Sequence, residues 1–90
     1  MAQIKFTSAL KRFFPTLEEG LIAGTNVKEV LSNLEDKYPG INDFLRDEQG
    51  HIRQHVNVFV KGELIEDELT LMDVVADGDE VLIFQALSGG

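Results

Sequence analysis

The stretch Asp77-Gly-Asp-Glu-Val-Leu-Ile-Phe-Gln-Ala-Leu-Ser-Gly-Gly90 decides the fold of this 90-residue chain. Its first three residues are typical of a turn, and residues 81–86 then alternate as a strand does. The strand runs directly into two glycines, which have the greatest backbone freedom of any residue. We therefore expect a folded domain over residues 1–86 and a flexible tail over residues 87–90, made of Leu87, Ser88, Gly89 and Gly90.

A chain that ends on two glycines has two interpretations. Most chain ends are simply frayed. A buried strand directly before the glycines, however, aims them in a fixed direction, and their narrow cross-section suits a tight channel in another protein. Under this second interpretation the free carboxylate of Gly90 is a substrate for an activating enzyme.

Residues upstream predict the rest of a sheet. Residues 3–8 alternate, with Ile4 and Phe6 on one face, and residues 18–23 return as the second strand of a hairpin that ends at Gly24. Phe13 and Phe14 are expected to fold over the core from the hairpin tip. Further strands are expected over residues 54–61 and, at the edge, 63–65, and residues 69–75 as a single helical turn or loop.

One amphipathic helix is predicted between the two halves of the sheet. Thr25 and Asn26 suit its start, and Glu29 three residues after Asn26 resembles a capping box. The apolar residues at helical spacing are Val27, Val30, Leu31, Leu34 and Tyr38. Pro39-Gly40 ends the helix, and residues 41–45 are predicted as a short second helix that places Phe44 and Leu45 against the sheet.

The order of these elements is strand, strand, helix, strand, strand. It predicts an α+β fold, a ubiquitin-like β-grasp with a mixed four- to five-stranded sheet and one main helix. A ferredoxin-like fold needs two full crossover helices, and the sequence supplies one. In a β-grasp domain the first and last strands are parallel neighbours, so the chain leaves the centre of the sheet.

Period-two alternation places Phe59, Leu82 and Phe84 on the sheet face away from the helix. Large apolar side chains on an exposed face usually mark a contact, so we expect a partner-docking patch here. The alternative is that the tail or the hairpin loop packs over them.

Composition excludes several classes of function. The chain has no cysteine, which removes disulfides, thiolate metal sites and thiol nucleophiles. A formal net charge of -8 argues against nucleic-acid binding. Without a long apolar run or a signal-like start, we expect no membrane association and a cytoplasmic protein that is a monomer when free.

No catalytic set stands out, so we expect a carrier or binding protein rather than an enzyme. His51 and His55 are interpreted as ordinary turn and strand residues rather than metal ligands, and no metal is expected. The acid-rich run Glu63, Glu66, Asp67, Glu68 lacks the spacing of a calcium loop and is interpreted as a solvated loop that a basic partner can meet. No phosphate-binding loop is present, so this chain is not expected to bind ATP itself.

Asp77-Gly-Asp-Glu-Val81, followed by a short strand and Gly89-Gly90, resembles the closing segment of the ubiquitin-like sulfur carriers. This is the family of the small molybdopterin-synthase subunit and the thiamine-pathway carrier, and the likeness extends back through residues 56–62 and the helix. It implies that a partner enzyme uses ATP to adenylate Gly90, that a sulfur donor converts Gly90 to a thiocarboxylate, and that a synthase accepts the sulfur.

The segment 39–50 before residues 56–60 resembles the carriers that supply sulfur for amino-acid synthesis, cysteine in particular. Molybdopterin, thiamine and tRNA thiolation stay open as pathways. The chain departs from the family's pattern at residues 85–87, which lack a common proline, and at Ser88, where alanine is more usual. Two other functions stay open: a protein modifier joined to lysines through Gly90, and a β-grasp interaction module without tail chemistry.

Overall fold

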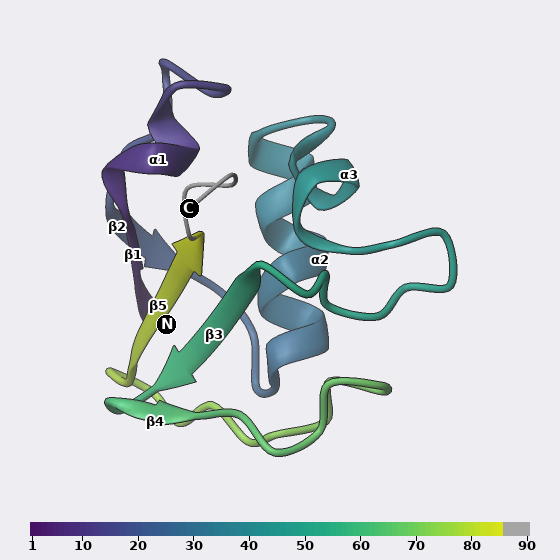
Figure 1. Ribbon diagram of the computed structural model, residues 1–90. Helices are drawn as coiled ribbons and strands as arrows, with labels where there is room; N and C mark the ends of the chain where they lie inside the picture. Colours follow the sequence, from purple (N-terminus) through teal and green to yellow (C-terminus); the bar gives the residue numbers. More distant parts are fainter. Residues whose placement is uncertain (86–90) are drawn as a thin grey trace.

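The computed structural model describes residues 1–85, in which a five-stranded mixed sheet carries helices on one face (Figure 1). The sheet order is β2-β1-β5-β3-β4, with strands β1 (Ala2–Phe6), β2 (Gly20–Ile22), β3 (Val56–Val60), β4 (Glu63–Leu64) and β5 (Glu80–Gln85). The helices are α1 (Ser8–Lys11), α2 (Val27–Lys37) and α3 (Ile41–Leu45). The predicted α+β β-grasp arrangement, the main helix and the short second helix are confirmed.

The first and last strands meet at the centre of the sheet. β1 and β5 are parallel, with Ile4 opposite Val81 and Phe6 opposite Ile83. On its other side β5 is antiparallel to β3, where Val58 lies opposite Ile83. The predicted parallel pairing is confirmed, and β5 is held by neighbours on both edges.

Helix α2 begins as its sequence predicts. The Glu29 N–H donates to the Asn26 side chain at 2.8 Å, so Asn26 is the N-cap. The Glu29 carboxylate accepts hydrogen bonds of 2.8 Å from both the N–H and the hydroxyl of Thr25, which lowers the pKa of Glu29. The capping box is therefore present, with Thr25 rather than Asn26 as the donor that Glu29 reaches.

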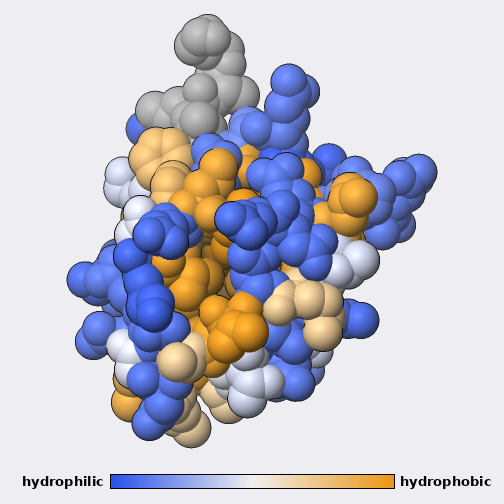
Figure 2. All heavy atoms as spheres, turned by 90° about the horizontal axis from the view of Figure 1, so that it is seen from below, coloured by the Kyte–Doolittle hydropathy of each residue, from blue (hydrophilic) through white to orange (hydrophobic). Residues whose placement is uncertain are grey.

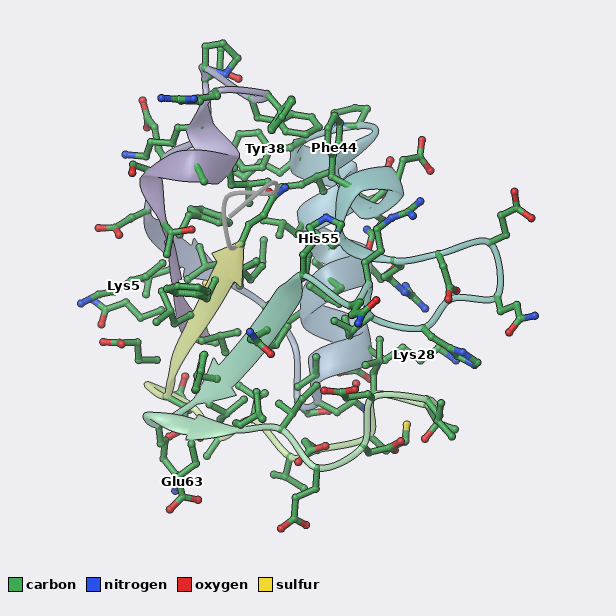
Figure 3. All side chains as sticks on the ribbon, in the orientation of Figure 1. Lys5, Lys28, Tyr38, Phe44, His55 and Glu63 are labelled. Atoms are coloured by element: carbon green, nitrogen blue, oxygen red, sulfur yellow. The ribbon has the colours of Figure 1, made fainter. Side chains whose placement is uncertain are left out.

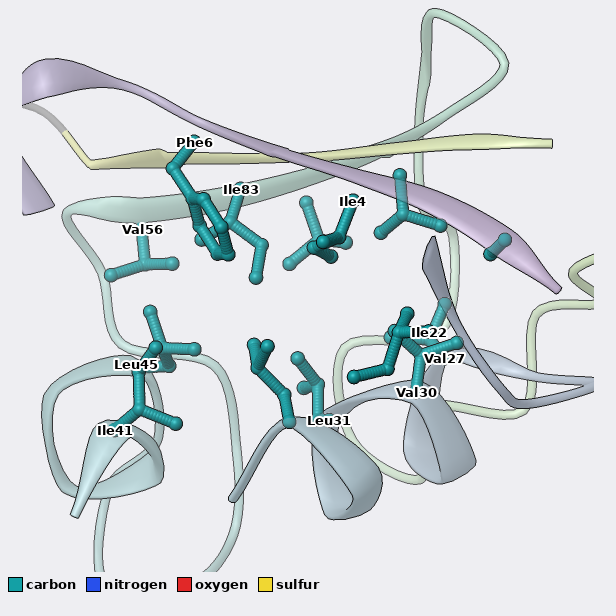
Figure 4. Close-up of a cluster of buried hydrophobic side chains, with 14 of the residues drawn as sticks. Ile4, Phe6, Ile22, Val27, Val30, Leu31, Ile41, Leu45, Val56 and Ile83 are labelled. Carbon is teal, nitrogen blue, oxygen red and sulfur yellow. The ribbon is translucent and has the colours of Figure 1, made fainter. Parts of the chain in front are cut away.

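The core lies between the sheet and the helices (Figure 4). Ile4, Phe6 and Ile83 point down from the sheet, and Leu31 and Leu45 meet them from α2 and α3. Each such side chain contributes ~1.5–3 kcal/mol when fully buried, so this interface supplies most of the folding energy. The apolar stripe predicted for α2 is the stripe that is buried.

The hairpin between β1 and β2 differs from its prediction. A four-residue helix, α1, follows β1, and β2 is shorter than the expected strand over residues 18–23. Phe14 is partly buried against the core as expected, whereas Phe13 is 54% exposed. Both rings contact Phe44 of α3, with ring-centroid distances of 4.8 Å for Phe13 and 5.1 Å for Phe14, so the aromatic contact joins the loop after α1 to α3.

The loop from residue 65 to residue 79 is built around two carboxylates. Asp73 accepts hydrogen bonds from the N–H groups of Glu66 and Asp67. Asp67 accepts from the hydroxyl and N–H of Thr70 and from the N–H of Met72, and these bonds lower the pKa of Asp67 to about 2. Asp67 is therefore a structural residue rather than only part of a solvated acidic run.

The same loop completes the start of α2. The first N–H groups of a helix have no partner within the helix. Here Val27 N–H donates to the Asp73 carbonyl at 3.1 Å and Lys28 N–H to the Leu71 carbonyl at 2.9 Å. Loop and helix therefore stabilise one another, and Leu71 and Val75 of the loop are buried in the core. No helix within residues 1–85 is both long enough and apolar enough to cross a bilayer.

Gly24→Ala is expected to lower the free energy of unfolding by roughly 1–3 kcal/mol. The backbone at Gly24 has a φ of +148°, and an added Cβ would lie 2.7 Å from Val30 Cγ2 and 2.8 Å from the Val30 nitrogen. Gly20→Ala is the matched control, since no atom lies within 4 Å of a Cβ there. Equal denaturation midpoints for the two variants would contradict this close approach.

Asp67→Asn is expected to flatten the acid limb of the stability profile. The folded-state pKa of Asp67, about 2, is below its unfolded value, so its contribution is present above about pH 4 and is lost as pH falls towards 2. Thermal unfolding between pH 2 and pH 5 measures the slope. Glu68→Gln removes the same charge one residue along without removing an acceptor of these bonds, and an equal slope change in that variant would refute the assignment.

Candidate functional site

The carboxyl end of β5 is where the described structure stops. Gln85 is the last residue described, and it lies at the centre of the sheet with Val56 opposite on β3. The predicted sulfur-attachment residue Gly90 and the predicted tail residues Leu87, Ser88 and Gly89 lie outside the described residues, as does the predicted domain boundary at residue 86. The structure therefore shows the base of the tail and how it is anchored.

The predicted docking residues form a cluster on the outer face of the sheet. Leu82 lies directly opposite Phe59, and Phe84 lies opposite Asn57, diagonal to Phe59. Phe84 is 40% exposed, while Phe59 and Leu82 are half-buried. All three side chains are thus on the face away from the helices, as the alternation predicted.

A fourth residue belongs to this cluster, and sequence reasoning missed it. Leu64 of β4 lies opposite Phe59 and is 48% exposed. The register follows from a two-residue turn at Lys61 and Gly62, both with positive φ. Lysine is not a usual signal for such a turn, so the partner of Phe59 was not readable from the sequence. We call Phe59, Leu64, Leu82 and Phe84 the outer-sheet patch.

Charged residues border the outer-sheet patch. Lys5 of β1 lies opposite Leu82, and its ammonium is 3.1 Å from the Glu80 carboxylate. Figure 3 shows Lys5 projecting from the sheet on the side away from α2. Because both side chains are more than a third exposed, this ion pair adds little stability, and its effect is to place one charge of each sign beside the apolar cluster.

A second apolar surface lies at the opposite end of β5 from Gln85. Leu69, Met72 and Val74 of the loop after β4 are 65%, 54% and 76% exposed. Figure 2, which views this end of the molecule, shows hydrophobic residues running as a band between hydrophilic margins. The outer-sheet patch and this loop surface approach one another at Leu64, which lines a surface hollow together with Val74.

The two histidines line the same surface hollow. His51 and His55 line an open hollow of about 580 Å³ between the loop before β3 and the loop after β4, together with Asp47 and Glu68. Within residues 1–85, no three or more His, Asp or Glu side chains gather closely enough to hold a metal ion. Asp47 instead accepts from the N–H groups of His51 and Gln49, which lowers the pKa of Asp47 and closes the turn predicted at residues 47–50.

Comparison with known proteins places this geometry in a family. The model of the ThiS family matches residues 4–90, which is nearly the whole chain and includes both final glycines. Over 70 residues the chain is 36% identical to the sulfur carrier protein CysO of Mycobacterium tuberculosis strain H37Rv, covering 76% of this chain and 75% of that protein.

Solved structures agree with the fold. The crystal structure of Mycobacterium tuberculosis CysO superposes with a TM-score of 0.82 and 27% identity, covering 97% of this chain and 100% of that one. A chain in the crystal structure of the BexX/CysO complex of Amycolatopsis orientalis superposes with a TM-score of 0.84 and 24% identity over 100% of both chains. Because the second structure is only 24% identical in sequence, it supports the fold alone.

Proposed function

This chain belongs to the ThiS family, and from that premise we propose that it is a sulfur carrier whose Gly90 carboxylate is converted to a thiocarboxylate. The observation that carries the proposal is that the family match runs to residue 90 and so includes Gly89 and Gly90. The absence of cysteine from the whole chain agrees with it, because sulfur then has no side-chain thiol to occupy.

The chemistry requires a partner. A carboxylate is a poor electrophile because its negative charge repels nucleophiles and oxide is a poor leaving group. In the proposed reaction the Gly90 carboxylate attacks the α-phosphate of ATP on an adenylating enzyme, and pyrophosphate leaves. A sulfur donor at the oxidation level of sulfide then attacks the acyl carbon and AMP leaves, so no net oxidation or reduction occurs.

In this proposal the carrier's own residues hold out the chain end to the partner enzyme and do not catalyse the reaction. The central position of β5, paired with β1 and β3, holds the end of the domain in place while the partner acts on the chain beyond it. The two final glycines keep the cross-section small beside a nucleotide. We place the reaction in the cytoplasm, where the ATP that the partner consumes is available.

The proposed use of the sulfur is the synthesis of cysteine or a related amino acid. Two observations support it: the 36% identity to a protein named sulfur carrier protein CysO, and the resemblance of segment 39–60 to such carriers. A synthase that accepts sulfur is therefore the second proposed partner, after the activating enzyme.

We assign the outer-sheet patch to docking of the activating enzyme. Its four apolar side chains are contiguous across β5, β3 and β4, and two of them, Leu82 and Phe84, lie on the strand that leads to Gly90. An enzyme that covers this face buries apolar surface, with ~1.5–3 kcal/mol available from each large side chain that becomes fully buried. Binding energy is thus gained on the domain, away from the reacting carboxylate.

Coexpression with the cognate activating enzyme is expected to add about 16 Da to the intact protein, because sulfur replaces oxygen in the thiocarboxylate. Deletion of Gly90 should abolish the gain without changing thermal unfolding, since the described sheet ends at Gln85. Ser88→Ala is the control and should be converted to the thiocarboxylate as the wild type is. Conjugation ladders on other proteins would support a protein modifier instead, and an unmodified mass would leave only an interaction module.

Phe84→Glu is expected to raise the KM for the carrier in the activating reaction roughly 10-fold, with little change in kcat, because it removes ground-state docking. Leu21→Glu is the matched control. Leu21 is also apolar, 61% exposed and on the outer face, but it lies on β2 at the far edge of the sheet from β4. A similar rise in KM for both variants would show a general charge effect and remove the patch from docking.

A further inference from the structure

The contact between β1 and β5 continues past the end of β1, at Thr7. β1 ends at Phe6, yet the Thr7 N–H donates to the Ile83 carbonyl at 3.2 Å and the Gln85 N–H donates to the Thr7 hydroxyl oxygen at 3.1 Å. The same hydroxyl lies 3.5 Å from the Gln85 carbonyl oxygen. Thr7 therefore contacts both backbone groups of the last described residue, 78 positions away in sequence.

The hydroxyl takes this role because the chain, and with it the Thr7 carbonyl, turns into α1 at this point. In a continuing parallel ladder the next acceptor for the Gln85 N–H would be that carbonyl. The chain turns into α1 at Thr7, however, and the carbonyl accepts from the Leu10 N–H at 3.2 Å. A side-chain acceptor is needed at this position, and Thr7 supplies one.

The start of α1 also shows that the Thr7 hydroxyl bonds to β5 and not to its own helix. Thr7 is the N-cap of α1, a position where a threonine hydroxyl ordinarily accepts from the helix's own N–H groups, yet its side chain makes no capping bond. Asn26, the N-cap of α2, does cap its helix. The Thr7 hydroxyl is thus directed across the sheet to β5 rather than along α1.

We propose that Thr7 is a positioning residue. Its hydroxyl holds the backbone of Gln85 beside β1, a contact that we call the latch, and so fixes the point from which the chain continues towards Gly90. Without the latch, Phe84 stays paired with Asn57 of β3, but the Gln85 N–H and carbonyl lose their partner on the β1 side. Gln85 must then be ordered again whenever a partner engages the chain beyond it, and this ordering weakens binding. The role in activation rests on the proposed function, whereas the latch itself does not.

The test uses the full-length protein in four forms: wild type, Thr7→Val, Thr7→Ser and Thr16→Val. Valine keeps the shape of threonine without the hydroxyl, serine keeps the hydroxyl, and Thr16 is an exposed threonine that serves as the control site. The first measurement is amide hydrogen exchange by NMR at Gln85, with Ile83 as the internal reference. The second is the KM and kcat of the activating enzyme for each carrier.

In Thr7→Val we expect the Gln85 amide to exchange about fivefold faster or more, the equilibrium factor of one ordinary hydrogen bond, with Ile83 unchanged. The KM should rise about fivefold with kcat unchanged, because ordering is a cost of binding. Thr7→Ser should restore both values, and Thr16→Val should alter neither. This split and the serine rescue separate positioning from a general loss of stability.

Each other outcome counts against the proposal. Unchanged exchange at Gln85 in Thr7→Val overturns the latch, and faster exchange at Ile83 as well shows general loosening instead. Faster exchange at Gln85 with an unchanged KM overturns the positioning role. If the wild-type carrier is not charged at all, the proposed function fails and the positioning role with it, while the exchange data alone still decide whether the latch exists.

Discussion

The parallel pairing of β1 with β5 is the constraint on which the rest of this fold depends. It joins the two ends of the domain, and no local contact can replace it, because parallel neighbours must be connected through the intervening chain. Everything between Thr7 and Glu80 has to be compact for the pairing to form. The contact is reinforced beyond the ladder, where the amino-terminal ammonium pairs with Asp77 and lowers the pKa of that carboxyl. The end of the domain therefore inherits the stiffness of its centre.

The sequence predicts this architecture because its helix-capping, helix-periodicity and strand-alternation patterns all favour the same fold. The α2 stripe, its Asn26 cap and the alternation in β5 each favour the same packing, so the β-grasp fold and the outward positions of Phe59, Leu82 and Phe84 could be read directly. Helix α1 could not, because four residues are barely one turn and show no period. Leu64 was missed because the register of a two-residue strand is set by backbone dihedrals rather than by composition.

The structural roles of the acidic residues could not be predicted from the sequence either, because their number does not show which carboxylates accept hydrogen bonds. The carboxylates whose pKa is lowered by backbone or side-chain donors or by the amino terminus are Glu29, Glu35, Asp47, Asp67 and Asp77. Glu35, for example, accepts from the N–H groups of Gly40 and Asn42 and so fixes the turn between α2 and α3. A substantial part of the negative charge thus closes turns and helix starts in a small domain with a thin core.

The net charge of -8 is consequently a poor guide to the partner. The domain measures 34 × 26 × 23 Å, whereas charges are screened beyond about 8 Å at physiological ionic strength. A protein that approaches the outer-sheet patch meets the charges beside it, and Lys5 there is paired with Glu80. In the proposed docking, apolar contact with the patch must then supply most of the affinity, because the charges beside it are already paired.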